Sequence, residues 1–239
     1  MPTNETFKIP SKRQNLFLRV TRGHFATSHS HTNYYIDITT QKMRLSEAKA
    51  VAQELLPYYN STTIVDTILC LDGTEVIGAC LAEELTRSGY MNMNAHQTIY
   101  VLTPEHTVGS QLVLRDNMVP MVAGKHVLVL AASVTTGYTA LGAIQAVDYY
   151  GGHVVGISSI FATTEQVGGY AVRSCFNPNN LPDYSSHLAH ECPQCKAGVK
   201  LDALINGFGY SKLYCPYRLW PRTEAYFLKS HGGQNEELD

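Results

Sequence analysis

The feature that most constrains the fold lies in residues 124–139. Residues 127–130 form a continuous apolar run, β-branched at alternate positions, and a Gly-Lys pair precedes it. Such a run is typical of a strand buried on both faces of a parallel sheet. Small and hydroxyl-bearing residues follow at 133–139, and residues 140–147 then space apolar side chains as a helix does. A loop between a strand and a helix N-terminus directs backbone N–H groups at one point and suits a phosphate.

Similar patterns recur along the chain. Apolar periodicity predicts helices and strands in alternation: a helix over 46–56, a strand over 63–71, a helix over 76–85, and strands over 97–102 and 153–161. This alternation predicts an α/β fold with a central, mostly parallel sheet flanked by helices. A ligand of such a sheet is expected at the carboxyl ends of the strands, where the loops gather.

Composition bounds the class of protein. The chain has 239 residues, which suits one α/β domain with additions, and its 44% hydrophobic and 16% charged residues are typical of a soluble globular protein. A net charge of -2 gives no electrostatic reason to expect nucleic acid or a membrane surface as a partner. We find no apolar run of the roughly 20 residues that a membrane helix needs and no signal-peptide pattern. Six cysteines without a signal then predict reduced thiols in the cytoplasm.

The central stretch resembles the phosphoribosyl-pyrophosphate (PRPP) motif of type I phosphoribosyltransferases. That motif has four apolar residues, two acidic residues, two more residues and then Thr-Thr-Gly. The resemblance implies that the loop holds a ribose 5-phosphate through Ser133, Thr135, Thr136, Gly137, Tyr138 and Thr139. The acidic pair, which contacts the ribose hydroxyls in the family, is replaced by Ala131 and Ala132. If the rest of the site is intact, restoring the carboxylates at these two positions is expected to raise the rate of transfer.

Residues 23–38 resemble the N-terminal hood of bacterial orotate phosphoribosyltransferases. They read Gly-His-Phe, then a turn rich in serine and histidine, then an aromatic strand. In that family the hairpin covers the base-binding pocket, so the resemblance implies a base near Tyr34 and Tyr35. The three histidines at 24, 29 and 31 lack a neighbouring cysteine or carboxylate in sequence, and we expect them to be exposed loop residues.

Asp72, Gly73 and Thr74 stand where the family has its pyrophosphate loop. Together with Glu75, Asp72 adds negative charge there, which a pyrophosphate tolerates only if Mg²⁺ bridges the two. Magnesium is therefore the cofactor that an active enzyme of this kind implies. The alternative is that Asp72 and Thr74 only cap the helix that follows.

Residues 103–117 correspond to a mobile catalytic loop that is rich in arginine and lysine in the family and reaches across a dimer. The resemblance thus implies a homodimer and a catalytic role for Arg115 and His106, which are all that remains of the cationic set. Losing positive charge that stabilises a leaving pyrophosphate should cost about 2.7–4 kcal/mol for each important donor.

The segment 181–198 also resembles orotate phosphoribosyltransferases, through a Pro-x-Tyr followed by Cys-Pro-x-Cys. One CxxC pair is half of a zinc site. A structural zinc completed by further residues is one interpretation, and the candidate ligands are His187, His190, Cys175 and Cys215. We favour the other, in which Cys192 and Cys195 are unreactive thiols in a proline-containing turn.

The resemblance as a whole implies a type I phosphoribosyltransferase-like fold in three parts. These are an N-terminal hood with the first helix (1–60), an α/β core (61–175) and a C-terminal extension (176–239). It implies an orotate phosphoribosyltransferase that converts orotate to orotidine monophosphate in pyrimidine nucleotide metabolism. The missing acidic pair supports an alternative: a catalytically impaired homologue that binds a small ribose-phosphate metabolite as a sensor or scaffold. We discount a nicotinamide-binding domain because no G-x-G-x-x-G follows a strand.

Overall fold

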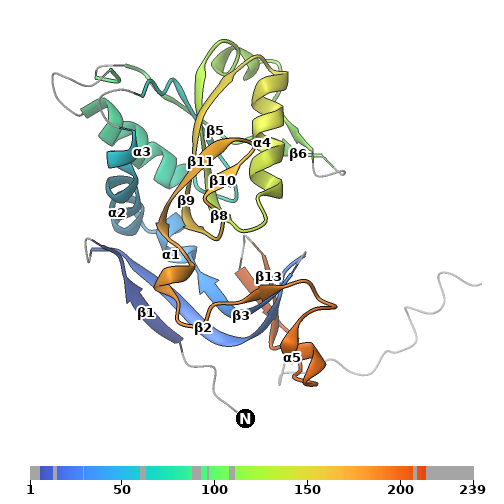
Figure 1. Cartoon of the computed structure of the whole chain (residues 1–239). Coiled ribbons are helices and arrows are strands. Elements are labelled where there is room, and N and C mark those ends of the chain that lie inside the picture. The colour runs from blue at the N-terminus through green and yellow to red at the C-terminus, as the bar shows by residue number, and fades with distance from the viewer. Residues whose placement is uncertain are drawn as a thin grey trace, which may run out of the picture.

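The chain folds around a mainly parallel sheet, seen in the upper part of Figure 1. The computed structural model describes residues 6–12, 15–28, 30–59, 63–87, 93–95, 97–107, 111–206 and 209–213. The strand order is β10-β11-β9-β8-β4-β5, and each neighbouring pair is parallel except β10 and β11. The strands are β4 (Thr67–Cys70), β5 (Tyr100–Leu102), β8 (His126–Val134), β9 (His153–Ala162), β10 (Gln166–Val167) and β11 (Tyr170–Phe176). This confirms the α/β class and the parallel sheet expected from the sequence.

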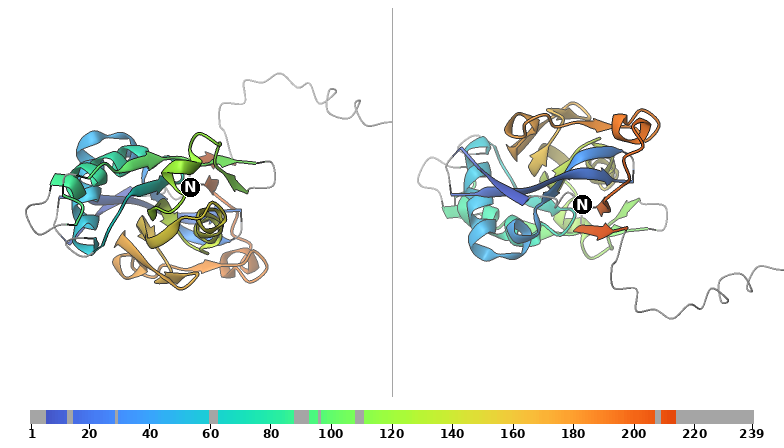
Figure 2. Two further views of the ribbon diagram at one scale, coloured as in Figure 1. Left: turned by 90° about the horizontal axis from the view of Figure 1, so that it is seen from above. Right: turned by 90° about the horizontal axis from the view of Figure 1, so that it is seen from below.

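Helices cover both faces of this sheet, as the views from above and below show (Figure 2). Helices α2 (Leu45–Leu55) and α3 (Glu75–Arg87) pack on one face, while α4 (Tyr138–Tyr149) packs on the other. The short α1 (Thr39–Met43) joins the first pair. Alternate residues of β8 point to opposite faces, so Leu128 belongs to one hydrophobic core and Val129 to the other.

A second sheet forms the hood, the lower part of Figure 1. It combines strands from both ends of the chain, in the order β12-β3-β2-β13-β14 with β1 also paired to β2. The strands are β1 (Thr6–Pro10), β2 (Phe17–Ala26), β3 (His31–Asp37), β12 (Ser186–His187), β13 (Ala203–Asn206) and β14 (Gly209–Lys212). Because β13 pairs in parallel with β2, the C-terminal segment is part of the hood.

The structure corrects two expectations about the ends of the chain. Residues 1–15 suggest a loose lead-in, yet β1 pairs with β2 over five residue pairs. The sequence of residues 201–213 suggests a segment packed on the body of the protein, and the structure places β13 and β14 of this segment in the hood sheet. Isolated hairpins carry weak sequence signals because their stability comes from the sheet that they join.

The remaining elements are short. A two-stranded hairpin of β6 (Glu105–His106) and β7 (Leu112–Val113) replaces the loop expected over 103–117, and Gly109 in its middle lies outside the described residues. The 3-10 helices are η1 (Leu56–Tyr58), η2 (Val119–Met121) and η3 (Pro178–Asn180), and α5 (Pro193–Lys196) is a single turn. None of the helices in the described part of the chain has the length and hydrophobicity of a membrane-spanning segment.

Candidate functional site

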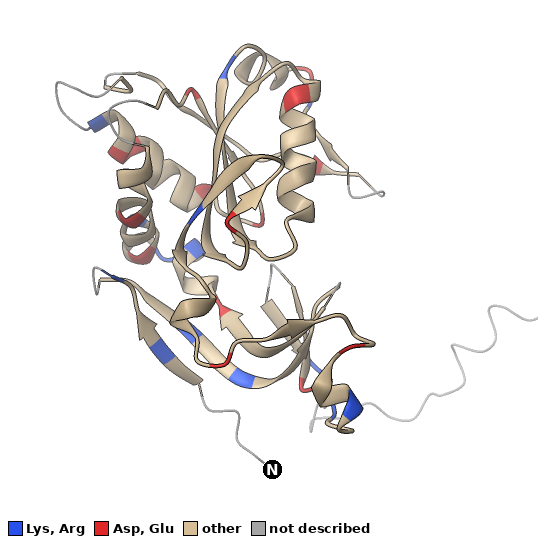
Figure 3. Ribbon diagram, viewed as in Figure 1, with Lys and Arg blue, Asp and Glu red and all other residues tan. Residues whose placement is uncertain are grey.

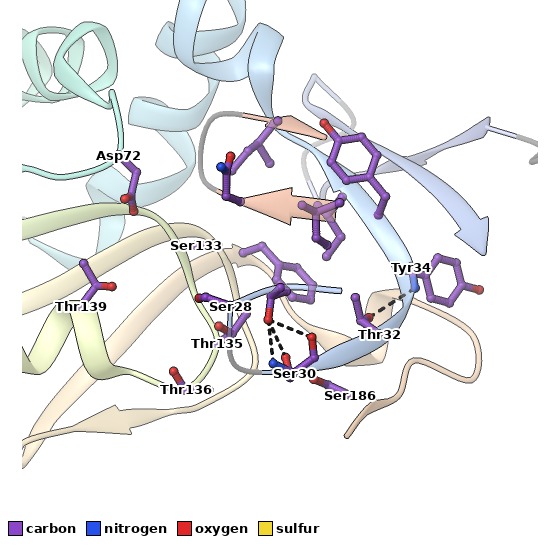
Figure 4. A pocket seen from close by; sticks show the side chains of 18 of the residues that line it. Ser28, Ser30, Thr32, Tyr34, Asp72, Ser133, Thr135, Thr136, Thr139 and Ser186 are labelled. Atoms are coloured by element: carbon purple, nitrogen blue, oxygen red, sulfur yellow. Dashed lines mark hydrogen bonds between the residues drawn. The ribbon is translucent and has the colours of Figure 1, made fainter. Parts of the chain in front are cut away.

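A pocket of about 240 Å³ lies between the parallel sheet and the hood (Figure 4). Its lining comes mainly from the loop after β8 with the start of α4, from the hood strands and their connecting turn, and from the C-terminal segment, and Asp72 and Phe161 add to it. The pocket thus sits at the carboxyl ends of the parallel strands, where the sequence predicts a ligand.

The loop after β8 has the geometry of an anion site. Gly137 is the N-cap of α4 with a φ of 80°, a left-handed conformation that favours glycine. The loop is held in place because Thr163 Oγ1 donates to the carbonyl oxygen of Thr135 at 2.8 Å. Four of the predicted phosphate-binding residues besides Gly137 have exposed side chains: Thr135, Thr136, Tyr138 and Thr139. These four residues and Ser133 line the pocket. The N-terminus of α4, a helix of 12 residues, lies beside them and offers unpaired backbone N–H groups.

The turn after β4 contributes one charged group to the pocket. Asp72 has a φ of 56°, and its carboxylate accepts a hydrogen bond from the backbone N–H of Ala132. Burial raises the pKa of this carboxyl, while the nearby charge of Lys42 and the Ala132 bond oppose the shift. Lys42 Nζ donates to the Asp72 carbonyl oxygen at 2.8 Å, which fixes the turn.

Gly73 and Thr74, the other two predicted residues of this turn, do not line the pocket. Thr74 is fully buried, and its hydroxyl lies 2.9 Å from the Leu71 carbonyl and 3.0 Å from the Leu130 carbonyl. The Thr74 hydroxyl therefore donates its proton to a carbonyl inside the protein, where the ends of β4 and β8 lie side by side. Thr74 directly precedes α3, and its carbonyl oxygen accepts the backbone N–H of Gly78 at 2.8 Å, so the interpretation that Asp72 and Thr74 cap this helix stays a prediction.

The hood supplies an aromatic wall. Tyr34 and Tyr35 both line the pocket, as predicted residues of the base site, together with Phe161 and Tyr184. The hydroxyl of Tyr34 donates to the Pro182 carbonyl oxygen at 2.8 Å, so it ties the hood to the C-terminal segment. The rings of Tyr34 and Tyr184 are stacked with centroids 6.4 Å apart, and Tyr184 meets Phe161 edge-on at 5.7 Å. A planar base would find apolar ring surface here.

Positive charge is scarce around the pocket. None of the described residues that line it is lysine or arginine, and Figure 3 shows the loop after β8 and the first turn of α4 without a cationic residue. Arg115 and His106, the predicted catalytic pair, lie on or beside the β6–β7 hairpin and do not line the pocket. The Arg115 guanidinium instead forms a two-bond ion pair with Glu105, at 2.9 and 2.5 Å. His106 is still near enough for its charge to favour the ionised form of Asp72.

Ala131 and Ala132, at the positions where the resemblance implies an acidic pair, face the protein interior. Ala131 is 1% exposed and packs in the core beneath α4, while Ala132 is 0% exposed and packs in the core beneath α2 and α3. Strand β8 continues past both residues to Val134. No side-chain oxygen therefore comes from these positions toward a ribose.

One carboxylate among the described lining residues is available to the magnesium ion that the resemblance implies. In phosphate sites Mg²⁺ is held by one or two carboxylates, with the substrate phosphates and water supplying the other oxygens. Asp72 is the single carboxylate among the described lining residues, and burial and the Ala132 hydrogen bond already constrain it. We therefore assign no step to a magnesium ion.

Several lining residues escaped prediction. They are polar side chains of the hood turn, of β3 and α1, and of strands built from the C-terminal segment: Thr27, Ser28, Ser30, Thr32, Thr39, Ser186 and Asn206. The serine-rich turn between the hood strands was a usable signal for the first three. The contribution of Ser186 and Asn206 could not be found from sequence because it depends on β12 and β13 joining a sheet that begins more than 150 residues earlier.

A parallel sheet with helices on both faces, a Thr-Thr-Gly loop after its central strand and a hood over that loop define the fold of the type I phosphoribosyltransferases. The chain has this fold. Leishmania donovani UMP synthase superimposes with a TM-score of 0.50 at 18% identity, over 75% of this chain and 36% of that one. Mycobacterium tuberculosis orotate phosphoribosyltransferase gives 0.49 at 18% identity, over 69% and 93% of the two chains, and Leishmania donovani adenine phosphoribosyltransferase gives 0.45 at 16%, over 63% and 73%. No protein-family model matches the sequence, and no curated protein matches it. At these identities the likeness establishes the fold alone.

Proposed function

We propose that the pocket binds a ligand that carries a ribose 5-phosphate, and that the chain is a phosphoribosyltransferase homologue impaired in transfer. The phosphate would lie on the loop of Ser133, Thr135, Thr136 and Thr139, with backbone N–H groups at the start of α4 as donors. The ribose and its substituent would extend toward the hood.

One observation carries this proposal: the phosphate-type loop and the hood enclose a single pocket, yet the described residues that line it include no cation. Binding a monophosphate needs hydrogen-bond donors, which the loop supplies. Displacing a pyrophosphate also needs positive charge on the leaving group, because that group gains negative charge in the transition state. The pocket therefore supports binding better than transfer.

A second candidate is transfer of phosphoribosyl from PRPP to a pyrimidine base such as orotate. The aromatic wall of Tyr34, Phe161 and Tyr184 favours it, since a planar base stacks well on such rings. In this case the cations would have to come from outside the described lining residues, for example from a partner subunit of a homodimer.

Calorimetry followed by a turnover assay tests the proposal. We expect ribose 5-phosphate and PRPP to bind to the full chain without added magnesium, and we expect no orotidine monophosphate to form with orotate present. Turnover would establish the second candidate instead. If neither phosphate compound binds, both functions are excluded and the fold serves another purpose.

Replacing Asp72 with asparagine tests the role of negative charge in the pocket. Asparagine keeps the size of the side chain, tolerates the positive φ of 56° and still accepts the Ala132 hydrogen bond. We expect Asp72→Asn to bind ribose 5-phosphate about fivefold more tightly at neutral pH, because removing one charge several ångströms away is worth about 1 kcal/mol. The measurement is calorimetry without magnesium.

The difference in affinity between Asp72→Asn and the wild type should depend on pH. Burial raises the pKa of Asp72, so the wild-type carboxylate gains a proton, and its repulsion of the ligand ends, as the pH falls through that raised pKa. The affinity of Asp72→Asn for ribose 5-phosphate, divided by that of the wild type, should then approach one. The titration of the ligand itself affects both proteins equally and cancels in this ratio. Weaker binding by Asp72→Asn would mean that a bridging cation is needed after all.

A further inference from the structure

Four potential metal ligands from the two ends of the chain meet at the side of the hood. They are His24 at the end of β2, His31 at the start of β3, and Cys192 and Cys195 around α5. One nitrogen or sulfur atom from each lies within 4.8 Å of all the others. We propose that these residues form a structural zinc site that joins the hood hairpin to the C-terminal segment.

The distances between the donor atoms suit a tetrahedral zinc ion. With Zn–N bonds of about 2.0–2.1 Å and Zn–S bonds of about 2.3 Å, the donors around one ion lie about 3.3–3.8 Å apart. His24 Nε2 lies 3.3 Å from His31 Nδ1, 3.4 Å from Cys192 Sγ and 3.6 Å from Cys195 Sγ. His31 Nδ1 lies 3.2 Å from Cys195 Sγ. Two imidazoles and two thiolates are a common ligand set of structural zinc.

The surroundings orient the first histidine as a ligand. His24 is 1% exposed, and its Nδ1 lies 2.9 Å from the Val199 carbonyl oxygen. A carbonyl only accepts, so Nδ1 carries the proton and the lone pair of Nε2 faces His31 and the two sulfurs. Zinc-bound histidines are usually held in this way by a second hydrogen bond. The sequence expectation that His24 is an exposed loop residue is therefore wrong.

An irregularity in β2 sets the direction of the His24 side chain. The register between β2 and β3 shifts between Arg22 and Phe25, and His24 and Phe25 are both buried although they are consecutive. Such a bulge turns one side chain away from the alternation of the strand. Phe25 packs toward Tyr35 inside the hood, and His24 is left to face Cys192.

The spacing of the ligands explains why sequence patterns did not reveal the site. In zinc fingers three to five residues stand between the two histidines, which lie on a helix. His24 and His31 are instead seven positions apart, on the paired strands of a hairpin. The other candidate ligands considered from sequence lie elsewhere. Cys175 is buried near Glu54, and His190 is exposed beside Glu191. His187 is paired with His31 in the hood sheet but does not belong to the group of four ligands. Cys215 and His29 are outside the described residues.

Metal analysis of the full-length chain, without any ligand, tests the site. We expect about one zinc ion per chain after desalting, and X-ray absorption should show two sulfur and two nitrogen neighbours. Cys192→Ser and His24→Ala should each lose zinc to a chelator at a concentration roughly tenfold or more below that needed for the wild type. Cys80→Ser and His190→Ala, a cysteine and a histidine outside the cluster, should retain it.

Cobalt provides a readout that needs no variant. After the zinc is removed from the wild-type chain under reducing conditions, added Co²⁺ should give the visible bands of a tetrahedral ion with thiolate ligands. Zinc retention by Cys192→Ser equal to that of the wild type would overturn the proposal. So would a metal-free protein whose intact mass shows Cys192 and Cys195 joined in a disulfide. Because none of these measurements uses a phosphate ligand, they stand apart from the proposed function.

Discussion

Introducing an acidic residue as Ala131→Glu is expected to lower the melting temperature by roughly 6–20 °C. The Ala131 side chain is 1% exposed within the hydrophobic core beneath α4. An unpaired carboxylate buried there costs roughly 3–5 kcal/mol. In a chain of this length each kcal/mol shifts the melting temperature by about 2–4 °C. Thermal unfolding followed by circular dichroism gives the measurement.

The burial of Ala131 and Ala132 argues against the sequence-based expectation that carboxylates at these positions would raise the rate of transfer. Ala132→Asp would place a second carboxylate beside Asp72, which accepts the Ala132 N–H, and should also destabilise the chain. The control is Ala123→Glu, an exposed position just before β8, which should change stability by less than about 0.5 kcal/mol. The penalty at Ala131 should shrink at low pH, because a buried glutamate has a raised pKa and becomes neutral as the pH falls. A variant that melts like the wild type and gains turnover would show that the strand can turn these side chains into the pocket.

Replacing Gly137 with valine is expected to weaken binding of ribose 5-phosphate at least tenfold. The φ of 80° costs a β-branched residue roughly 1–3 kcal/mol, and its Cβ would lie 2.8 Å from Val167 Cγ2. Because the loop must move to relieve both, the donors at the start of α4 leave their positions. Calorimetry measures the affinity, and circular dichroism checks that the variant remains folded.

Gly142→Ala is the matched control for this loop. Gly142 lies inside α4, and a Cβ there meets no atom within 4 Å. Alanine should therefore leave binding unchanged and stabilise the helix by up to about 1 kcal/mol. Thr136→Ala should give an intermediate loss of affinity, since it removes one hydroxyl and leaves the backbone in place. Wild-type affinity in Gly137→Val would place the phosphate elsewhere.

Local sequence patterns predicted four strands of the main sheet, β4, β5, β8 and β9, because apolar residues mark each of them, and they missed β10 and β11. The apolar run of β8 predicts a strand buried on both faces, and the apolar spacing of α4 predicts a helix buried on one face. The structure has both elements. The hood sheet was harder to predict. Strand β13 has four residues and reaches its place only by pairing with β2, which no local pattern encodes.

The candidate site divides in the same way. The Thr-Thr-Gly loop follows its strand directly, so Thr135, Thr136 and Gly137 could be assigned to it from the sequence. Arg115 could not be placed from sequence, because its pairing with Glu105 depends on how β6 and β7 fold back on each other. The histidine and cysteine cluster shows the same limit, since its two halves are more than 160 positions apart and each looks incomplete alone.

The hood sheet also sets the order in which the molecule can be completed during synthesis. Strands β1 to β3 leave the ribosome first, but β13 and β12, their partners in that sheet, are made last. The parallel core has all its strands once β11 has emerged, so it can fold while the early strands still lack half of their sheet. A released chain that ends before residue 186 would contain every strand of the parallel core and the loop after β8, but only β1, β2 and β3 of the hood sheet. Shortening the gene from its 3′ end should therefore damage the cover well before it damages the core.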